Sequence, residues 1–266
     1  MVGQDENSEP QEDYQAILDH EIAAGIRQFG RSKTGLVLSS LSAGLDIGFG
    51  PLLMVAVLTL FAGRETEPVV RLLVANAYAV GFIFVILGRS ELFTEHTTLA
   101  VLPVLDRKAS VRALGRLWGL VWVANLIGAL FFSWFAVLVA LELGVASVEA
   151  FGHLASELIG PAWWAVTLSA VLAGWLMGLL SWLVSAGRDT ISQILLVWIV
   201  TALIGFLGLH HSIAGSVEVL MGVFVGSGAS WSDYGFFLVW ATVGNAIGGV
   251  VFGALIKYGH VTVENL

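Results

Sequence analysis

The sequence contains no cysteine and few charged residues. Of its 266 residues, 12% are charged and 57% are hydrophobic, and the mean hydropathy is +0.87. Because soluble domains carry about 25% charged residues, this composition excludes a soluble enzyme. The absence of cysteine excludes disulfides, thiolate metal sites, iron–sulfur clusters and cysteine nucleophiles.

The charge that is present is mostly acidic and gathers near the N-terminus. The net charge is −8 and no basic stripe occurs, which argues against a nucleic-acid partner. Residues 1–34 hold seven acidic and three basic side chains, with apolar residues at helical spacing and no signal peptide. We therefore expect a cytoplasmic tail with an amphipathic helix over 1–34, a transmembrane domain over 35–260 and a cytoplasmic tail over 261–266.

Long apolar segments dominate the rest of the chain. A bilayer core of about 30 Å needs about 20 apolar residues. The sequence predicts six spans, at about 35–62, 69–89, 113–142, 162–186, 190–225 and 235–257. The polar stretch 88–96 follows the second span and 208–211 interrupts the fifth, so these two spans are predicted to be broken.

The loops predict an orientation in the membrane. With six spans both termini share one side, and nine of the twelve Lys and Arg residues fall on that side. Because basic residues favour the cytoplasmic face, we expect both termini in the cytoplasm of a multi-pass protein of the inner membrane.

The two halves of the sequence resemble each other. An A-G-x-x-x-G pattern and a small-N-x-I-G-small pattern each occur twice, at 43–48 with 173–178 and at 124–129 with 244–249. The breaks at Glu91 and His211 each precede the following asparagine, Asn125 or Asn245, by 34 residues. Three spans repeated as three have opposite orientations, which is typical of transporters with broken helices at the midplane. A break in the bilayer needs protein or water around it, so the breaks mark the predicted pore, where helix N-termini favour an anion.

These motifs resemble the formate/nitrite transporter family. The resemblance rests on 91–94 (E-L-F-T), 211–214 (H-S-I-A) and the two N-x-x-G motifs, and it covers most of 15–260. It implies an all-α, aquaporin-like inverted repeat of three plus three helices and a homopentamer with one pore per protomer. It also implies passage of small monovalent anions such as formate, nitrite or hydrosulfide. By the family pattern Thr94 and His211 flank the constriction, and Leu92 and Phe93 are candidates for its apolar ring.

The sequence also departs from the family pattern. His210 replaces the usual acid before the central histidine, and Gly174 stands where the fourth span usually has asparagine. The vestibule lysine is missing, and Arg89 occupies a position that is normally small. These departures are typical of a divergent branch, in which the fold carries over better than the substrate.

The polar residues near the breaks have alternative roles. His211 is the strongest pore candidate, as a hydrogen-bond or proton donor that lets the substrate cross as a neutral acid. His210 either lines the pore or donates to a backbone carbonyl. Arg89 either pairs with Glu91 or attracts the anion. Thr94 donates its hydroxyl to substrate, caps the second half-helix, or does both.

The asparagines and the polar residues at 149–157 have more ordinary interpretations. Asn125 and Asn245 are expected to lock helices together more than to touch substrate. Glu149, His153 and Glu157 share a helical spacing, but a solvated face is favoured over a metal site. No nucleotide motif, catalytic triad or cofactor site occurs, so no enzyme activity is predicted.

The sequence therefore predicts a channel or proton-coupled transporter for small monovalent anions, with protons, lipid and its own copies as partners. Two alternatives remain open. One is a channel for water or a neutral solute on the same fold. The other is a scaffold or sensor that acts through the acidic tail.

Overall fold

The computed structural model describes residues 13–187 and 189–264, and these residues form helices without any strand. Residues 1–12 of the acidic tail, the loop residue 188 and the last two residues lie outside the described residues. The elements are α1 (Tyr14–Gly30), α2 (Lys33–Asp46), α3 (Phe49–Leu60), α4 (Pro68–Leu87), α5 (Phe93–Leu99), α6 (Leu102–Leu105), α7 (Val111–Glu142), α8 (Val148–Ile159), α9 (Trp163–Ala186), α10 (Thr190–Phe206), α11 (Ala214–Val225), α12 (Trp231–Ile247), the π-helix η1 (Gly248–Leu255) and α13 (Ile256–Glu264).

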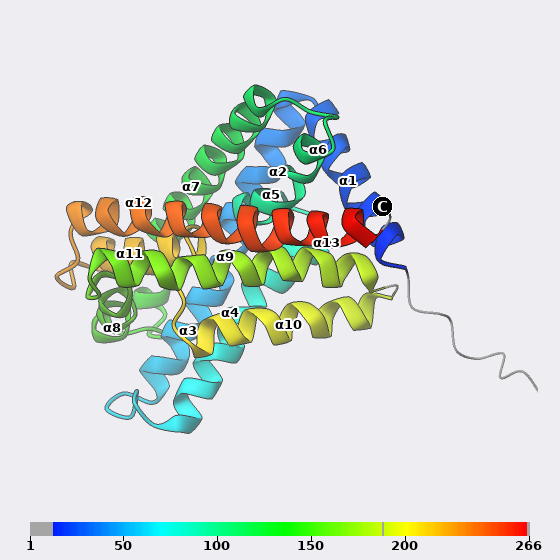
Figure 1. The fold of residues 1–266 in the computed structure, drawn as a ribbon. Helices are drawn as coiled ribbons and strands as arrows, with labels where there is room; N and C mark the ends of the chain where they lie inside the picture. The colour runs from blue at the N-terminus through cyan, green and yellow to red at the C-terminus, as the bar shows by residue number, and fades with distance from the viewer. Residues whose placement is uncertain (1–12, 188, 265–266) are drawn as a thin grey trace, which may run out of the picture.

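Five helices in the described part of the chain are long and apolar enough to cross a membrane. They span Lys33–Leu60, Pro68–Leu87, Val111–Glu142, Trp163–Ala186 and Trp231–Val263. Two shorter apolar helices, α10 and α11, occupy the region where the fifth span is predicted. In Figure 1, α9 lies between α12 and α10, and α2 packs against α7.

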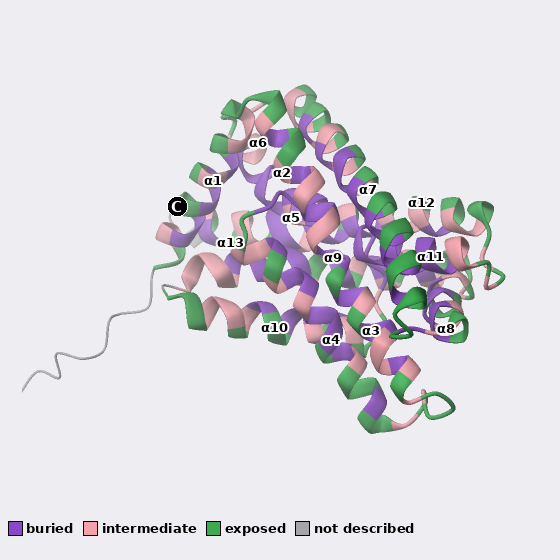
Figure 2. Cartoon of the chain, turned by 180° about the vertical axis from the view of Figure 1, so that it is seen from behind, coloured by how far each residue is buried: buried purple, intermediate pink, exposed green. Residues whose placement is uncertain are grey.

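The outer faces of the long helices carry apolar side chains that no other part of the chain covers. On α7, Phe131, Phe135 and Leu138 are all more than half exposed. Figure 2 shows the same division, with buried residues toward the middle of the helix packing and exposed ones on the outside. Such faces suit contact with lipid or with a neighbouring protomer.

Two pairs of helices end inside the apolar region. Helix α4 ends at Leu87, Arg89 takes a left-handed backbone conformation (φ 54°), and α5 begins at Phe93. Helix α10 ends at Phe206, Gly208 takes φ 62°, and α11 begins at Ala214. The helix ends fall in the two polar stretches where the sequence predicts interruptions.

Two buried asparagines hold the segments between these helices by the same set of hydrogen bonds. The Asn125 amide donates to the carbonyls of Ser40 and Glu91 and accepts from the Phe93 N–H. The Asn245 amide donates to the carbonyls of Ala170 and His210 and accepts from the Ser212 N–H. Each asparagine thus joins its own helix to a neighbouring long helix and to an interrupted segment, which agrees with the locking role expected from the sequence.

Close backbone contacts accompany the asparagines. A Cβ added to Gly44 would lie 2.1 Å from the Asn125 carbonyl oxygen, and one added to Gly174 would lie 2.2 Å from the Asn245 carbonyl oxygen. No side chain fits at either position without moving a helix. The glycine at 174, where the family pattern has asparagine, is therefore required by the packing of α9 against α12.

Helix α1 packs against the protein. Ile17, Leu18 and Ile22 are buried in a cluster with Leu102 of α6 and Trp182 of α9. The apolar face of this amphipathic helix is therefore buried against the protein itself.

A buried carboxyl group, Glu21, fastens α1 to the end of α9. Its side chain accepts hydrogen bonds from Ser181, at 2.8 Å, and from Ser185. Burial raises the pKa of Glu21 above its ordinary value, and the two serine hydrogen bonds act in the opposite direction with smaller effect. The docked state therefore favours the protonated form of Glu21.

The first prediction concerns Gly174. We expect Gly174→Ala to destabilise the protein by about 1–3 kcal/mol, because the new methyl group forces α9 away from α12. Gly119→Ala is the matched control, since nothing lies within 4 Å of a Cβ added to that helical glycine. Thermal unfolding of the two purified variants in detergent measures the difference, and equal midpoints would contradict the packing argument.

The second prediction concerns the pH dependence of α1. A raised pKa in the docked state means that docking is strongest at low pH and weakens as pH rises through that pKa. We expect the hydrogen-exchange protection factors of residues 14–30 to fall between about pH 5 and about pH 8, and Glu21→Gln to reduce the fall. Asp19→Asn, an exposed position on the same helix, is the control. Protection that rises with pH in the unaltered protein would contradict this assignment.

Candidate functional site at the two helix interruptions

The two interrupted segments bring Thr94 and His211 into direct contact. The Thr94 Oγ1 and His211 Nε2 atoms are 2.8 Å apart, and both side chains are buried. Thr94 lies in the first turn of α5, and His211 lies three residues before α11. Residues separated by 117 positions in the sequence thus meet at one point.

The backbone around His211 fixes which ring nitrogen carries the proton. His211 Nδ1 accepts hydrogen bonds from the N–H groups of Ile213, at 3.3 Å, and Ala214, at 3.2 Å. A nitrogen that accepts these bonds carries no hydrogen, so the proton is on Nε2. His211 therefore donates to Thr94 Oγ1 as a neutral imidazole, and the Thr94 hydroxyl keeps its own hydrogen for another acceptor.

The side chain of Phe82, from α4, packs against the His211 ring. The Phe82 and His211 rings are 5.1 Å apart between centroids, with the edge of one toward the face of the other. Phe82 is fully buried. The three side chains Phe82, Thr94 and His211 form what we call the central contact.

A cavity of about 460 Å³ lies at one end of α4. We call it the α8 cavity because α8 forms one wall. Its lining includes Arg71 and Tyr78 from α4, His153 and Glu157 from α8, and Glu218 from α11. The Tyr78 hydroxyl is buried and has no hydrogen-bond partner among the described residues.

A second cavity, of about 120 Å³, lies at the other end of α4. We call it the α1 cavity because Glu21 of α1 lines it. Ile86 of α4, Glu95 and Leu99 of α5 and Ser181 of α9 also line it. No basic side chain of the described residues forms part of its lining.

One face of α4 links the two cavities to the central contact. Arg71 and Tyr78 line the α8 cavity, Phe82 packs on His211, and Ile86 lines the α1 cavity. Arg71 is in the first turn of α4 and Ile86 is in its last turn, and residues spaced by three or four positions share a helix face. The central contact therefore lies between the cavities along α4. Sequence reasoning missed Phe82 and Tyr78, although their i, i+4 aromatic spacing was visible.

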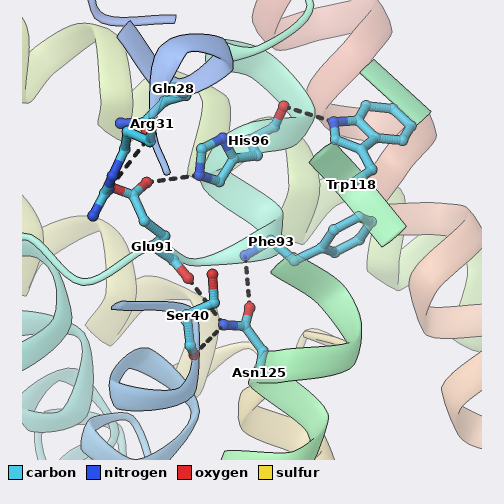
Figure 3. A network of polar contacts seen from close by, with 8 residues as sticks. All are labelled: Gln28, Arg31, Ser40, Glu91, Phe93, His96, Trp118 and Asn125. Carbon is cyan, nitrogen blue, oxygen red and sulfur yellow. Dashed lines mark hydrogen bonds and ion pairs between the residues drawn. The ribbon is translucent and has the colours of Figure 1, made fainter. Parts of the chain in front are cut away.

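Glu91 takes part in a polar network that the sequence did not predict (Figure 3). Its carboxylate forms an ion pair with Arg31 and accepts a 2.7 Å hydrogen bond from His96 Nε2. The pairing of Arg89 with Glu91, one of the two roles left open for Arg89, is absent, because Arg89 is exposed and makes no ion pair with any described residue. The network instead ties the C-terminal end of α1 to the interrupted segment.

The other predicted site residues surround the central contact without lining either cavity. Leu92 is fully buried, and the Phe93 ring turns toward Trp118 of α7, 5.9 Å away. His210 Nε2 donates to the Leu158 carbonyl at 3.1 Å, and Nδ1 is 2.9 Å from the Ser169 hydroxyl. Of the two roles left open for His210, this geometry is the carbonyl hydrogen bond.

The described residues contain no group of three His, Cys, Asp or Glu side chains that could hold a metal ion. His153 and Glu157 approach each other at 3.5 Å on α8, in a partly exposed pair. What the arrangement offers chemically is a buried pair of hydrogen-bond donors between two cavities.

Comparison with known proteins identifies the family. A family model described as "Formate/nitrite transporter" matches residues 15–259. The chain is 31% identical to a probable formate transporter of Methanothermobacter thermautotrophicus over 84% of this chain and 87% of that protein. It is 30% identical to the inner membrane protein YfdC of Escherichia coli over 92% of this chain and 78% of that protein.

Solved structures share the fold. An FNT family ion channel matches 92% of this chain and 99% of its own, with a TM-score of 0.82 and 22% identity. A pentameric formate channel with formate bound matches 88% of this chain and 98% of its own, with a TM-score of 0.71 and 20% identity. Together with the membrane-length apolar helices and the family match over nearly the whole chain, this makes the protein a multi-pass member of the formate/nitrite transporter family.

Proposed function

We propose that the protein is a channel or proton-coupled transporter for small monovalent anions such as formate, nitrite or hydrosulfide. The observation that carries the proposal is the contact of Thr94 with His211 between two cavities. An ion that moves between the cavities has to pass this point. Relatives described as formate and nitrite transporters support the choice of substrate class.

The chemistry of the central contact suits a small anion or its conjugate acid. Dehydrating an ion in a buried site is costly unless hydrogen-bond donors replace water. His211 Nε2–H and the Thr94 hydroxyl supply two donors in a place that Phe82 shields from water. Since the His211 ring is neutral, it stabilises the substrate by hydrogen bonding, and a negative ion crosses this point most readily together with a proton.

We further propose six membrane crossings arranged as an inverted repeat of three plus three, with the second and fifth interrupted. The matching hydrogen bonds of Asn125 and Asn245 support the repeat. In this arrangement α10 and α11 together make the fifth crossing. The distribution of Lys and Arg supports an orientation with both termini, and with them α1 and the α1 cavity, on the cytoplasmic side.

We propose a homopentamer in the inner membrane, with one pathway in each protomer. The related formate channel is described as pentameric, and the Escherichia coli relative is described as an inner membrane protein. The exposed apolar faces of the long helices provide surfaces for both protomer contacts and lipid.

Flux into proteoliposomes tests the proposal. Formate, nitrite, hydrosulfide, lactate and water are compared at two pH values with protein-free vesicles as the baseline. Anion flux through intact pentamers is the expected result. Water flux without anion flux favours the neutral-solute alternative. An absence of any flux, with loss of a soluble partner on deletion of the acidic tail, favours the scaffold alternative.

The third prediction separates the hydroxyl of Thr94 from its shape. Thr94→Val removes the hydroxyl at nearly constant volume, and we expect anion flux to fall by about tenfold, as for the loss of one buried hydrogen bond of about 1.4 kcal/mol. Thr94→Ser keeps the hydroxyl and is expected to retain flux. Equal flux in the Val and Ser variants would show that the Thr94 hydroxyl takes no part in transport.

His211→Asn is expected to change the pH dependence of anion flux.

The fourth prediction concerns Arg89. Because this side chain is exposed and lines neither cavity, we expect Arg89→Ala to leave anion flux unchanged. Initial rates of formate uptake at low salt, where electrostatic attraction is strongest, give the most sensitive comparison. A clear loss of rate there would restore Arg89 as the group that attracts the anion.

A further inference from the structure

Each cavity contains a carboxyl group without a partner. Glu95 lines the α1 cavity and Glu218 lines the α8 cavity. Neither side chain makes a hydrogen bond or an ion pair with any other described residue; Glu218 is buried and Glu95 is half-buried. In a membrane domain with few charges, acids without a partner inside the protein are candidates for a functional role.

The groups around Glu95 are acidic. Glu21 from α1 lines the same cavity, and Glu91 from the preceding segment acts on Glu95 with the same sign. The Glu91 charge is met by Arg31 and His96, which leaves no basic side chain over for Glu95. The polar groups that α9 contributes to this cavity are the hydroxyls of Ser181 and Ser185, and both donate hydrogen bonds to Glu21.

The groups around Glu218 also leave it without a cation. Glu157 from α8 and the hydroxyl of Tyr78 from α4 are its ionisable neighbours. Neither basic group of this cavity forms an ion pair with Glu218. His153 lies 3.5 Å from Glu157, and the exposed Arg71 guanidinium lies over the Phe206 ring, 5.7 Å from its centroid.

These surroundings restrict how an anion enters. Two like charges forced into one site cannot both remain ionised, and two carboxyl groups in that position share a proton. A formate ion in the α1 cavity meets Glu95 and Glu21 and no base, so it is accepted there only when a proton comes with it. Formic acid and a glutamic acid side chain are acids of similar strength, so the proton moves between them at little cost.

We propose that Glu95 and Glu218 are the proton-exchange groups of the two cavities. This inference rests on the proposed function. On entry, the O–H bond of the protonated glutamate breaks, an O–H bond forms on the substrate oxygen, and the glutamate is left as a carboxylate. The neutral acid crosses the central contact. At the other cavity the O–H bond of the acid breaks, the second glutamate, in its carboxylate form, takes the proton, and the anion leaves. The first glutamate then takes a proton from water on its own side, and the second releases one to water on the other side.

The geometry gives each group its place in this sequence of steps. Glu95 directly follows Thr94, so the α1 cavity opens next to the central contact. Glu218 lies on the second turn of α11, which begins three residues after His211. The unpartnered Tyr78 hydroxyl in the α8 cavity is a donor available to Glu218 or to the substrate.

The test measures formate uptake and proton uptake together in proteoliposomes that contain a pH-sensitive dye, with the membrane potential clamped. The variants are Glu95→Gln and Glu218→Gln, which remove the exchangeable proton, and Glu95→Asp and Glu218→Asp, which keep it. Glu142→Gln, an exposed acid at the end of α7, is the matched control. Assembly of every variant is checked by size-exclusion chromatography.

We expect one proton per formate in the unaltered protein, uptake that does not depend on membrane potential, and a loss of about tenfold or more in each Gln variant. The Asp variants and Glu142→Gln are expected to retain uptake.

Removing an acid that merely repelled anions would raise formate uptake, so equal or faster uptake in the Gln variants overturns the inference. Uptake of methylammonium in place of formate, lost in the Gln variants, also overturns it, because it identifies a cation site. If the unaltered protein takes up formate and the Gln variants do so equally fast, the inference about Glu95 and Glu218 fails while the proposed function stands. If the unaltered protein takes up no weak acid, the proposed function itself fails.

Discussion

The fold depends on which groups form hydrogen bonds with the backbone N–H and C=O groups where α4 and α10 end inside the apolar region. A backbone N–H or C=O without a partner costs several kcal/mol in hydrocarbon, roughly the cost of losing a whole hydrogen bond. Asn125 and Asn245 meet this cost by the same device, with one amide binding a carbonyl and an N–H of the interrupted segment and a carbonyl of a neighbouring helix. The close approach of helices at Gly44 and Gly174 brings those carbonyls within reach.

The same device fixes the chemistry of the central contact. Asn245 holds the backbone on both sides of His211, through the His210 carbonyl and the Ser212 N–H. The N–H groups that follow it then bind Nδ1 and leave the proton on Nε2, directed at Thr94. A structural requirement of the broken helix thus decides the protonation state of the ring. The position of Thr94 follows in the same way from the hold of Asn125 on Phe93.

Local sequence patterns and the family resemblance predicted some features of the site, but not the contacts that depend on how the helices pack. The polar stretches 88–96 and 208–211 lie next to the ends of α4 and α10. The family pattern named Thr94 and His211 as residues that flank one constriction, and in the structure the two side chains are in contact. The sequence did not predict the partner of Glu91, because Arg31 lies 60 positions away and becomes a neighbour only once α1 and α2 have packed. Nor did it predict the direction of the His210 ring, which depends on where α8 places the Leu158 carbonyl. Phe82 was missed because an aromatic residue in an apolar span carries no local signal of function.

Because only 12% of the residues are charged, the few charged side chains near the two cavities largely determine which species can enter. Glu91 forms an ion pair with Arg31 and accepts a hydrogen bond from His96, so its carboxylate holds the basic side chains nearest the α1 cavity before a substrate meets them. A cavity that attracted free anions would need the opposite arrangement, with a base unpaired and the acids bound. Among the residues that the structure describes, no basic side chain lines the α1 cavity beside the unpaired Glu95, whereas Arg71 lines the α8 cavity without an ion pair. We therefore infer that entry at the α1 cavity depends on the proton that accompanies the anion more than on attraction of the negative charge.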